Sequence, residues 1–535
     1  MSLWFSRDEF SDEERGILHR YFTNVEGPVF ALVNLPEVVK GALFARYSRT
    51  PKSIRRLFLD EFAEQVEERA GTAAVGVERA EKLYDRVFFE YGDDSVAQLG
   101  GVHLACEQAS QLLAKALEWG RLAAYLEQST RYMRYDDKPG SRWRSTTPAE
   151  IEGTDLQGPF EAFLDTSFGI YRRLFEPVQA FYRELFPKDP ADSDFVYSST
   201  ITAKTCDTLR DLLPAATRSN VGIYATGQSY EQMLLRMRAH PLQEVREYSD
   251  LMLVELRKVI PAFLKRVDID DRGVAWTNYL RETRERVEEA AGKALLGMAA
   301  EDREEVTLAD FDPDGEVKVV AAALYAASDL PDDQLLEVAR EMTAEERADM
   351  LRAYVGERGN RRHRPGRAFE RTGYRFDLLC DYGAFRDLQR HRLLTLEWQR
   401  LTTRHGYELP PEIEAAGFLR DWEEAMEASA AMHDEMNAAG HEEAAQYAVA
   451  MAYRLRFVMQ MNAREAMHLA ELRSSPQGHP VYRRVAQRMH DLISRVHPAI
   501  GAVMTYVDHS SVDLERLEAE RRTEAKRRAR DASDG

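Results

Sequence analysis

Arg386-Asp387-Leu388-Gln389-Arg390-His391-Arg392 is the stretch around which the rest of the chain is organised. The sequence upstream of it has the composition of a buried helix, and the stretch ends in three consecutive cationic or titratable side chains. Charged groups in such a place are costly unless they are paired, so the stretch indicates that something anionic is held there. This local excess of positive charge is informative because the whole chain has a formal net charge of −19.

A related stretch lies half a chain earlier. A shift of 271 residues places Trp119 opposite Arg390, and it places residues 122–127 opposite residues 393–398. The earlier copy has Trp119-Gly120-Arg121 where the later copy has Arg390-His391-Arg392. The head of the pattern is therefore preserved only in the later copy.

Further along, the difference between the copies is reversed. The earlier copy continues Glu127-Gln128-Ser129-Thr130-Arg131-Tyr132, whereas the later copy has Arg400 and Thr402 opposite Ser129 and Arg131. A slip of two residues would instead offer Thr402 and Arg404. Each copy holds residues that the other lacks.

A second pair of segments supports a diverged tandem duplication. The segment from Gly227 to Pro241 resembles the segment from Asn462 to Pro480, and aligning Arg238 with Arg473 gives an offset of 235 residues. Because this offset differs from 271, the halves also differ by insertions. Two repeats in the same order favour a duplication more strongly than either repeat does alone.

Composition limits the classes of protein that need to be considered. A chain of 535 residues with 44% hydrophobic and 30% charged residues predicts a soluble globular protein of two or more domains. Neither a membrane-spanning run nor a signal-peptide core is visible, and the acidic balance argues against nucleic-acid or anionic-membrane partners. The odd, widely spaced set of three cysteines predicts a reducing compartment, with Cys106 and Cys206 as buried inert thiols. A cytoplasmic enzyme is favoured.

Local patterns predict the main elements and the domain boundaries. Residues 306–311 and 374–379 have the pattern of strands, whereas the apolar stretch 96–126 has helical periodicity. After Pro410 nearly everything is predicted to be helical up to Val507. We place a first domain at 1–269, a helical connector at 270–304, a second domain at 305–513 and a charged tail at 514–535.

The two stretches together resemble the signature of the flavin-dependent thymidylate synthases. The family pattern is Arg-His-Arg, seven residues and then Ser-x-Arg, commonly with Glu two residues before the Ser and Tyr after the Arg. Arg390-His391-Arg392 matches the head of this pattern, and Glu127 to Tyr132 matches its tail. The mirror combination, Trp119-Gly120 with Arg400 and Thr402, departs from the pattern.

Other segments extend the resemblance over most of both halves. Arg456, Asn462-Ala463-Arg464 and Leu472-Arg473 resemble the family's phosphate-binding Arg, its flavin-binding Asn-Ala-Arg and its Leu-Arg pyrimidine contact. Tyr91-Gly92-Asp93-Asp94-Ser95 and Phe369-Glu370 resemble two further family segments more faintly.

The resemblance implies both a fold and a reaction. The implied fold class is α+β, with two tandem helix-rich domains that each contain a small antiparallel sheet packed by long helices. The implied reaction is the FAD-dependent reductive methylation of dUMP to dTMP, with methylenetetrahydrofolate and NADPH as co-substrates. Hydride would pass from the reduced flavin to the uracil ring without an enzyme nucleophile, and Arg473 would polarise the pyrimidine.

The resemblance also implies roles for individual residues. The catalytic residues would be Arg473 and Arg390. The residues that bind the cofactor would be Arg390, His391, Arg392, Asn462, Arg464 and Glu370. The residues that bind the substrate would be Glu127, Gln128, Ser129, Arg131, Arg456, Arg473 and Asp387. The residue types suit these roles, because planar Arg donors bind phosphate oxygens in a fork and Arg or His can stabilise a reduced flavin.

In family members the active site lies between subunits of a tetramer. We therefore expect a composite site that combines residues 127–132 with residues 390–392 and 462–464, while the mirror site would be inactive. A homodimer of this chain would then form a pseudo-tetramer with two sites.

Several alternatives stay open at the level of sequence. The chain could be a non-catalytic or repurposed family member that binds flavin or nucleotide, and an RNA-binding protein is disfavoured by the acidity. The basic loop Arg361–Arg367 could be a phosphate site or a salt-bridged surface. His103, His363, His468 and His479 do not have the spacing of metal ligands, so no metal is predicted.

Overall fold

The computed structural model describes residues 9–27, 30–47, 52–68 and 98–533 of the chain. The chain divides into two compact units that alternate along the sequence. Unit 1 comprises residues 1–109, 120–128 and 220–298, and unit 2 comprises residues 110–119, 129–219 and 299–535. The domain boundaries at residues 269, 304 and 513 stay sequence predictions, and the segment Tyr91–Ser95 lies outside the described residues.

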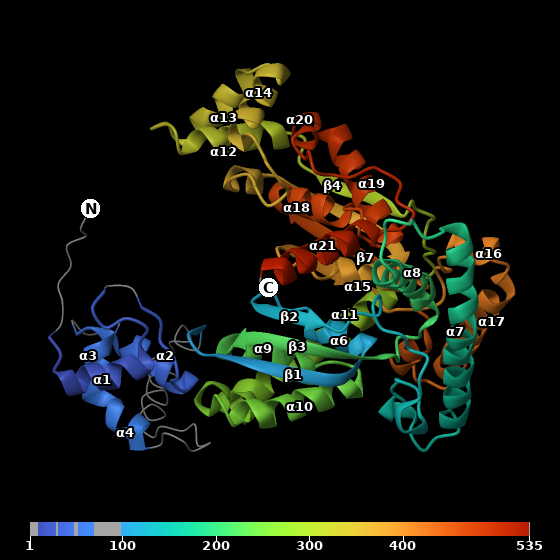
Figure 1. The fold of residues 1–535 in the computed structure, drawn as a ribbon, viewed down its shortest axis with the longest axis horizontal. Coiled ribbons are helices and arrows are strands. Elements are labelled where there is room, and N and C mark those ends of the chain that lie inside the picture. The colour runs from blue at the N-terminus through green and yellow to red at the C-terminus, as the bar shows by residue number, and fades with distance from the viewer. Residues whose placement is uncertain (1–8, 28–29, 48–51, 69–97, 534–535) are drawn as a thin grey trace. The chain divides into compact units, whose positions relative to one another are not determined.

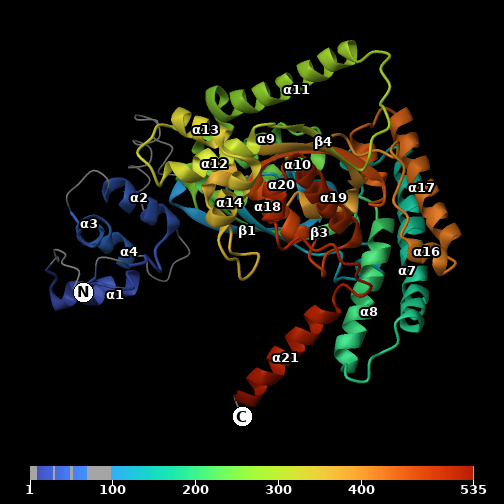
Figure 2. The same ribbon diagram turned by 90° about the horizontal axis from the view of Figure 1, so that it is seen from above.

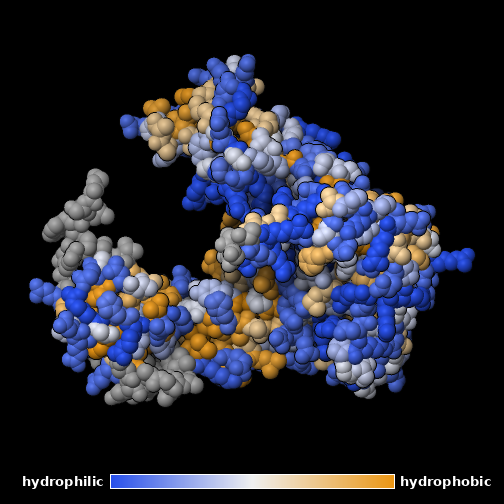
Figure 3. Space-filling view, in the orientation of Figure 1, coloured by the Kyte–Doolittle hydropathy of each residue, from blue (hydrophilic) through white to orange (hydrophobic). Residues whose placement is uncertain are grey.

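Unit 1 contains a three-stranded sheet in the order β1-β3-β2, from β1 (Gly101–Ser110), β2 (Ala123–Glu127) and β3 (Arg218–Thr226) (Figure 1). Strands β2 and β3 are antiparallel, with Tyr125 opposite Ile223. Leu122, Leu126 and Tyr224 are exposed, and apolar surface gathers over this sheet in Figure 3. The helices among the described residues of unit 1 are α1 (Asp12–Tyr21), α2 (Glu37–Tyr47), α3 (Ile54–Glu61), α4 (Ala63–Glu68), α9 (Gly227–Arg238), α10 (Gln243–Arg257) and α11 (Ala275–Ala294), with 3-10 helix η6 (Pro261–Asp268) and π-helix η7 (Asp270–Val274).

The helix predicted over residues 96–126 is wrong for most of its described part. This region forms strand β1, the short helix α6 (Gln111–Leu117) and strand β2. In β1 the buried apolar positions are Val102, Cys106 and Ala109, whose spacing of four and then three imitates a helix. The alternation is interrupted at Gln108, which has a positive φ of 58° and shifts the inward-facing side chains by one residue.

Unit 2 is built on a four-stranded antiparallel sheet in the order β4-β5-β7-β6 (Figure 1). Strands β4 (Val306–Phe311) and β5 (Gly373–Asp381) confirm the two strands predicted from sequence. Strand β6 spans Leu394–Trp398, and β7 (Arg454–Asn462) overturns the expectation of helix after Pro410. Leu455, Phe457, Met459 and Met461 are buried at every second position of β7, so the period of a strand was present in the sequence.

Helices surround this sheet in unit 2. Two long ones, α7 (Gln157–Leu185) and α17 (Leu419–Ala438), lie side by side in both views (Figures 1 and 2). The others are α6 (Gln111–Leu117), α8 (Asp194–Leu209), α12 (Gly315–Tyr325), α13 (Asp332–Glu341), α14 (Ala344–Val355), α15 (Tyr382–Leu388), α16 (Pro411–Ala415), α18 (Ala463–Arg473), α19 (Pro480–Val496), α20 (Pro498–Ala502) and α21 (Leu517–Ser533). Short 3-10 helices are η3 (Pro139–Ser141), η4 (Ala149–Ile151), η5 (Arg210–Leu212), η8 (Arg367–Arg371) and η9 (Ala444–Ala448).

The predicted α+β fold class, with one small antiparallel sheet from each half of the chain, is confirmed. Within the described ranges, none of the helices has the length and apolar content needed to cross a membrane.

The duplication is visible in the backbone hydrogen bonds of unit 2. Ala215 N–H donates to Val449 O at 2.8 Å, and Met451 N–H donates to Leu213 O at 2.9 Å. These two bonds exchange if each residue is replaced by the one 236 positions away (213 to 449, 215 to 451). Pro214 forms an antiparallel bridge with its own counterpart Ala450, so a local pseudo-twofold axis passes between these two residues.

The same relation extends to side chains that hold the long helices. Ser167 Oγ on α7 donates to Leu212 O at 2.9 Å, and Ser429 Oγ on α17 donates to Ala448 O at 2.8 Å. The carbonyl residues Leu212 and Ala448 keep the offset of 236, whereas Ser167 and Ser429 are 262 residues apart, because the copies differ by insertions. The two copies therefore pack their long helices by the same polar contact.

The structure also corrects the alignment of the second repeat by one residue. Thr226 and Asn462 are the N-caps of α9 and α18, and each side chain accepts a hydrogen bond from the backbone N–H three residues on. Strand register agrees, because Ile223 of β3 and Met459 of β7 face Tyr125 and Leu396 on the neighbouring strands. Asn462 therefore corresponds to Thr226, and the predicted pairing with Gly227 is off by one because only the capping residue marks where each helix begins.

Two buried carboxyl groups near the pseudo-twofold axis give a testable pH dependence. Burial raises the pKa of Asp211 to about 6, although Arg210 opposes the shift, and burial and Asp211 raise the pKa of Asp381 well above its usual value. A raised folded-state pKa contributes stability that is complete below the unfolded pKa, about 3.9, and is lost as the pH rises through the folded pKa.

We therefore expect the free energy of unfolding to fall between about pH 4 and pH 6, by on the order of 2–3 kcal/mol. Asp381→Asn should reduce this slope and stabilise the protein at pH 7, since Asn keeps the N-cap bond that Asp381 accepts from Ala384 N–H at 2.7 Å. Urea unfolding at several pH values measures the effect. An unchanged slope in the variant would show that Asp381 does not contribute to this pH dependence.

Candidate functional site

The Arg390-His391-Arg392 loop follows helix α15, whose residues are all buried. Asp381 caps the helix, and Gln389 Nε2 donates to Lys115 O at 2.9 Å beyond its end. The loop therefore starts from a buried helix, which the composition of the upstream sequence predicted. The two arginines of the loop are half-buried or exposed, whereas His391 is buried.

Asp387 is the acidic partner of this loop. One carboxylate oxygen lies 3.5 Å from Arg390 Nη1, and the other accepts from Arg210 Nη1 at 3.2 Å. Burial alone would raise the pKa of Asp387, but the positive charges of Arg390 and Arg210 hold it well below its ordinary value. Asp387 is therefore an internal counter-ion of the predicted site.

Arg473, at the end of α18, lies beside the loop. Its Nε–H donates to His391 Nε2 at 2.9 Å, and its guanidinium carbon stands 5.5 Å from the centre of the Tyr482 ring. Among the described residues, none accepts a hydrogen bond from its two terminal Nη nitrogens. Arg473 therefore presents an unused pair of donors while its Nε is held.

Arg131 lies on the same tyrosine, with its guanidinium carbon 5.7 Å from the ring centre. Unlike Arg473, it is fully occupied: Nε and Nη2 each donate to a carboxylate oxygen of Asp207 at 2.6 Å, and Nη1 donates to Tyr482 Oη at 2.8 Å. The structure thus brings together Arg131 of the first half and Arg473 of the second half within one chain, in unit 2.

The residues predicted to bind flavin form a second group at the start of α18. Asn462 Oδ1 caps the helix, and Arg464 Nε donates to Pro365 O at 2.9 Å in the basic loop. Arg464 Nη1 lies 3.4 Å from Glu370, which also pairs with Arg367 at 2.9 Å. Three predicted residues, Asn462, Arg464 and Glu370, are therefore gathered around the loop Arg361–Arg367.

Comparison with known proteins fits this arrangement. Two segments, residues 41–262 and 307–499, match the family described as thymidylate synthase complementing protein. The chain belongs to this family, the flavin-dependent thymidylate synthases.

Similar relatives span nearly the whole chain. UPF0159 proteins of Chlamydia muridarum (strain MoPn / Nigg) and Chlamydia pneumoniae are each 37% identical, over 529 and 524 residues. These alignments cover 97% of this chain, and 99% and 98% of the two relatives. A UPF0159 protein of Thermoplasma acidophilum is 30% identical over 515 residues, which are 91% of this chain and 99% of the relative.

Among solved structures, a UMP/dUMP methylase PolB from Streptomyces cacaoi bound with 5-Br dUMP is similar to part of the chain. The identity is 18% and the TM-score 0.30, over 38% of this chain and 96% of that one. The family assignment rests on the sequence matches and not on this likeness.

One predicted substrate-binding residue of this family member, Arg456, points away from the helix that precedes the Arg-His-Arg loop. Arg456 lies on β7 and pairs with Asp377 at 3.1 Å, next to Phe457, whose ring packs on Phe385 of α15. Because successive side chains of a strand point to opposite faces, Arg456 faces away from α15. Glu127 and Gln128 belong to unit 1, where Gln128 N–H donates to Asn220 O at 2.8 Å.

Ser129 is engaged locally, since its Oγ accepts from Arg131 N–H at 3.2 Å. The Arg131 side chain points to Asp207 from this segment. Ser129 and Arg131 therefore share a turn.

Sequence reasoning missed three residues of the site: Asp207, Arg210 and Glu465. Glu465 directly follows Asn-Ala-Arg, and its third position in α18, after an Asn N-cap, was a signal for a first-turn carboxylate. No local pattern marks Asp207 or Arg210, whose partners are far away in the sequence.

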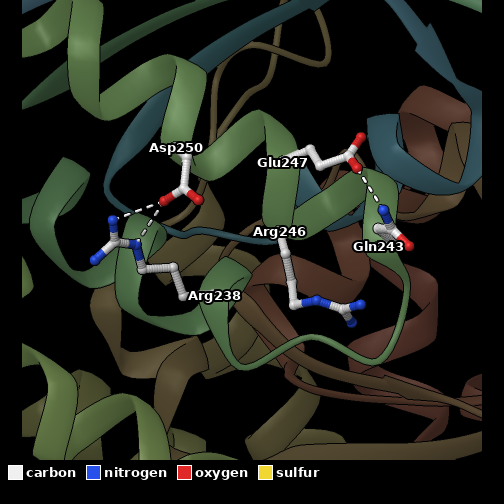
Figure 4. Close-up of a pocket in the computed structure, with 5 residues that line it drawn as sticks. All are labelled: Arg238, Gln243, Arg246, Glu247 and Asp250. Carbon is white, nitrogen blue, oxygen red and sulfur yellow. Dashed lines mark hydrogen bonds and ion pairs between the residues drawn. The ribbon is translucent and has the colours of Figure 1, made fainter. Parts of the chain in front are cut away.

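A separate open pocket in unit 1 is lined by Arg238, Gln243, Arg246, Glu247 and Asp250 (Figure 4). Arg238 binds Asp250 through Nη2 at 2.6 Å, and Arg246 Nη1 donates to His240 O at 2.8 Å. The positive groups are thus already engaged, and the mixed charge gives no preference for an anion.

Proposed function

We propose that this chain is a FAD-dependent thymidylate synthase that methylates dUMP to dTMP, with methylenetetrahydrofolate and NADPH as co-substrates. The observation that carries the proposal is Arg473, a guanidinium with two unused donors that is held beside the Arg-His-Arg loop. Such a pair of donors suits the carbonyl edge of a pyrimidine, where it would stabilise the charge that develops as the ring becomes nucleophilic.

The residues around the basic loop fit an anionic cofactor such as FAD. Asn462 uses only its Oδ1 as a cap, and within the described residues its amide nitrogen makes no hydrogen bond, which leaves a donor at the positive end of α18. We expect the cofactor to be held by Asn462, Arg464 and the loop Arg361–Arg367. Four further residues would lie near it: Arg390, His391, Arg392 and Glu370. Bound FAD would supply the hydride.

No thiol of the described chain suits a nucleophilic mechanism. Cys106, Cys206 and Cys380 are buried, and burial raises the pKa of Cys106 and Cys206 to about 12. This supports transfer of hydride without an enzyme nucleophile. The free cysteines also fit the cytoplasmic location that we propose.

The test is direct. Purified protein should carry the visible absorbance of flavin and should form dTMP from dUMP and methylenetetrahydrofolate only when NADPH is supplied. Flavin absorbance without dTMP would favour a family member that binds flavin or nucleotide but does not turn over dUMP. One observation favours that alternative, namely that the Arg131 guanidinium is already occupied by Asp207.

Arg464→Ala should lower FAD occupancy, because it removes a charge-assisted donor and releases Pro365 of the basic loop. We expect roughly a ten-fold or greater loss of FAD affinity with a cooperative fold retained. Absorbance of the purified variant measures it. Gln228→Ala, at the counterpart position on α9, is the matched control, and equal loss in both variants would count against the assignment.

We also propose that the chain is a homodimer. The proposal is supported by the internal pseudo-twofold axis, which relates segments of the two copies within unit 2, and by Arg456, which faces away from α15, as a residue serving a neighbouring copy would. Light scattering at micromolar concentration should give twice the mass of the chain. The mass of a single chain would contradict this proposal.

A further inference from the structure

Arg473 is connected through His391 to a third residue, Glu465. His391 Nε2 accepts from Arg473 Nε at 2.9 Å, and His391 Nδ1 lies 2.9 Å from Glu465 Oε1. His391 and Glu465 are both buried. The three side chains form a continuous line from the first turn of α18, across the loop after α15, to the last residue of α18.

The chemistry of the donors determines where the proton of His391 lies. A guanidinium Nε–H can only donate, so His391 Nε2 must carry a lone pair. The single proton of a neutral imidazole is then on Nδ1, where it can donate to the Glu465 carboxylate. Burial and the charges of Arg473 and Arg364 lower the pKa of His391 well below its usual value, in agreement with a neutral ring.

A metal ion is a poor alternative occupant of this cluster. Nitrogen and oxygen atoms of His391, Glu465 and His468 lie within 4.8 Å of one another, a separation that a metal ion could bridge. However, Arg364 Nη2 lies 3.1 Å from His468 Nε2, and Arg473 donates to His391. Two guanidinium groups directed at the two imidazoles repel a cation and favour neutral histidines that accept hydrogen bonds.

We propose that Glu465 and His391 are positioning residues for Arg473. Glu465 selects the tautomer of His391, and His391 then fixes Arg473 Nε, so that the two Nη donors are directed outward in one orientation. The Tyr482 ring also lies beside the guanidinium. The inference rests on the proposed function for the identity of the ligand, dUMP, but the tautomer and the contacts do not depend on it.

The test compares two substitutions of similar size. His391→Gln keeps an acceptor within reach of Arg473 Nε, whereas His391→Leu removes it. His391→Leu should weaken dUMP binding roughly ten- to a hundred-fold with FAD retained, and His391→Gln should restore most of the affinity. In an Arg473→Ala background, His391→Leu should cause no further loss. His490→Leu, which removes a histidine of α19, controls for general effects.

Two outcomes in the binding series would overturn the proposal. Loss of FAD from His391→Leu in parallel with dUMP would make His391 a cofactor ligand, and an equal loss in the Arg473→Ala background would make its role purely structural. Nitrogen-15 NMR of labelled histidine provides a readout that needs no ligand. It should show His391 protonated on Nδ1 alone, with Glu465→Ala disturbing this state.

The NMR experiment also separates the two proposals. A protein that binds no dUMP would refute the proposed function, yet an Nδ1-protonated His391 that changes in Glu465→Ala would still support the positioning role. A proton on Nε2, or on both nitrogens, would overturn the positioning role even in an active enzyme.

Discussion

Arg473→Ala will lower kcat/KM for dTMP formation by roughly a hundred- to a thousand-fold while FAD stays bound. The expected loss is large because Arg473 has its Nε held by His391 and both Nη nitrogens unused by described residues. Its removal takes away donors that would act on the ligand and leaves no buried carboxylate without a partner. Arg473→Lys should recover only part of the activity, since an ammonium carries the charge but not the planar fork.

The matched control is Arg238→Ala. Arg238 ends α9 as Arg473 ends α18, but it is paired with Asp250 in unit 1. Steady-state kinetics on dUMP, with flavin absorbance recorded for each preparation, gives the comparison. Unchanged kinetics in Arg473→Ala, or loss of flavin in step with activity, would remove the residue from the catalytic role.

The second large effect concerns folding stability. Arg131→Ala should destabilise the protein by about 3–5 kcal/mol, because it leaves Asp207 as a buried charge without its partner. Asp207 is buried, and burial would raise its pKa if Arg131 did not hold that pKa below its ordinary value. Urea unfolding at neutral pH measures the change. The double variant Arg131→Ala with Asp207→Ala should recover part of the loss, since no charge then stays buried.

Arg400→Ala is the control from the other copy. Arg400 pairs with Glu442 at 3.0 Å and with Glu443, but on an exposed surface, so its removal should cost less than about 1 kcal/mol. A similar loss of folding free energy in both variants would mean that the buried Arg131–Asp207 pair does not stabilise the fold as proposed. If Arg131→Ala also weakens dUMP binding while it stays folded, the pair opens to admit the phosphate.

The sequence by itself predicted the features of this protein that short, local motifs encode. Arg390-His391-Arg392, Asn462-Ala463-Arg464 and Arg473 are short motifs with unusual residue types, and they lead to the family that the matches confirm. The α+β class followed from the family resemblance, whereas two strands of the second sheet followed from period and turn signals. Where a bulge at Gln108 altered the period of a strand, the same reasoning predicted a helix.

Only the tertiary structure decided which charged residues are used inside the protein and which are left for a ligand. Arg131 and Arg473 are the same residue type in the sequence. In the structure, however, the Asp207 carboxylate neutralises the Arg131 guanidinium, whereas His391 only accepts a hydrogen bond from Arg473 Nε. Asp207 lies 76 residues from Arg131 in the sequence, and Glu465 lies 74 residues from His391. Local sequence patterns cannot predict hydrogen bonds between residues so far apart in the chain. A charge in a folded protein is available only when no nearby group satisfies it, and that depends on packing between distant segments.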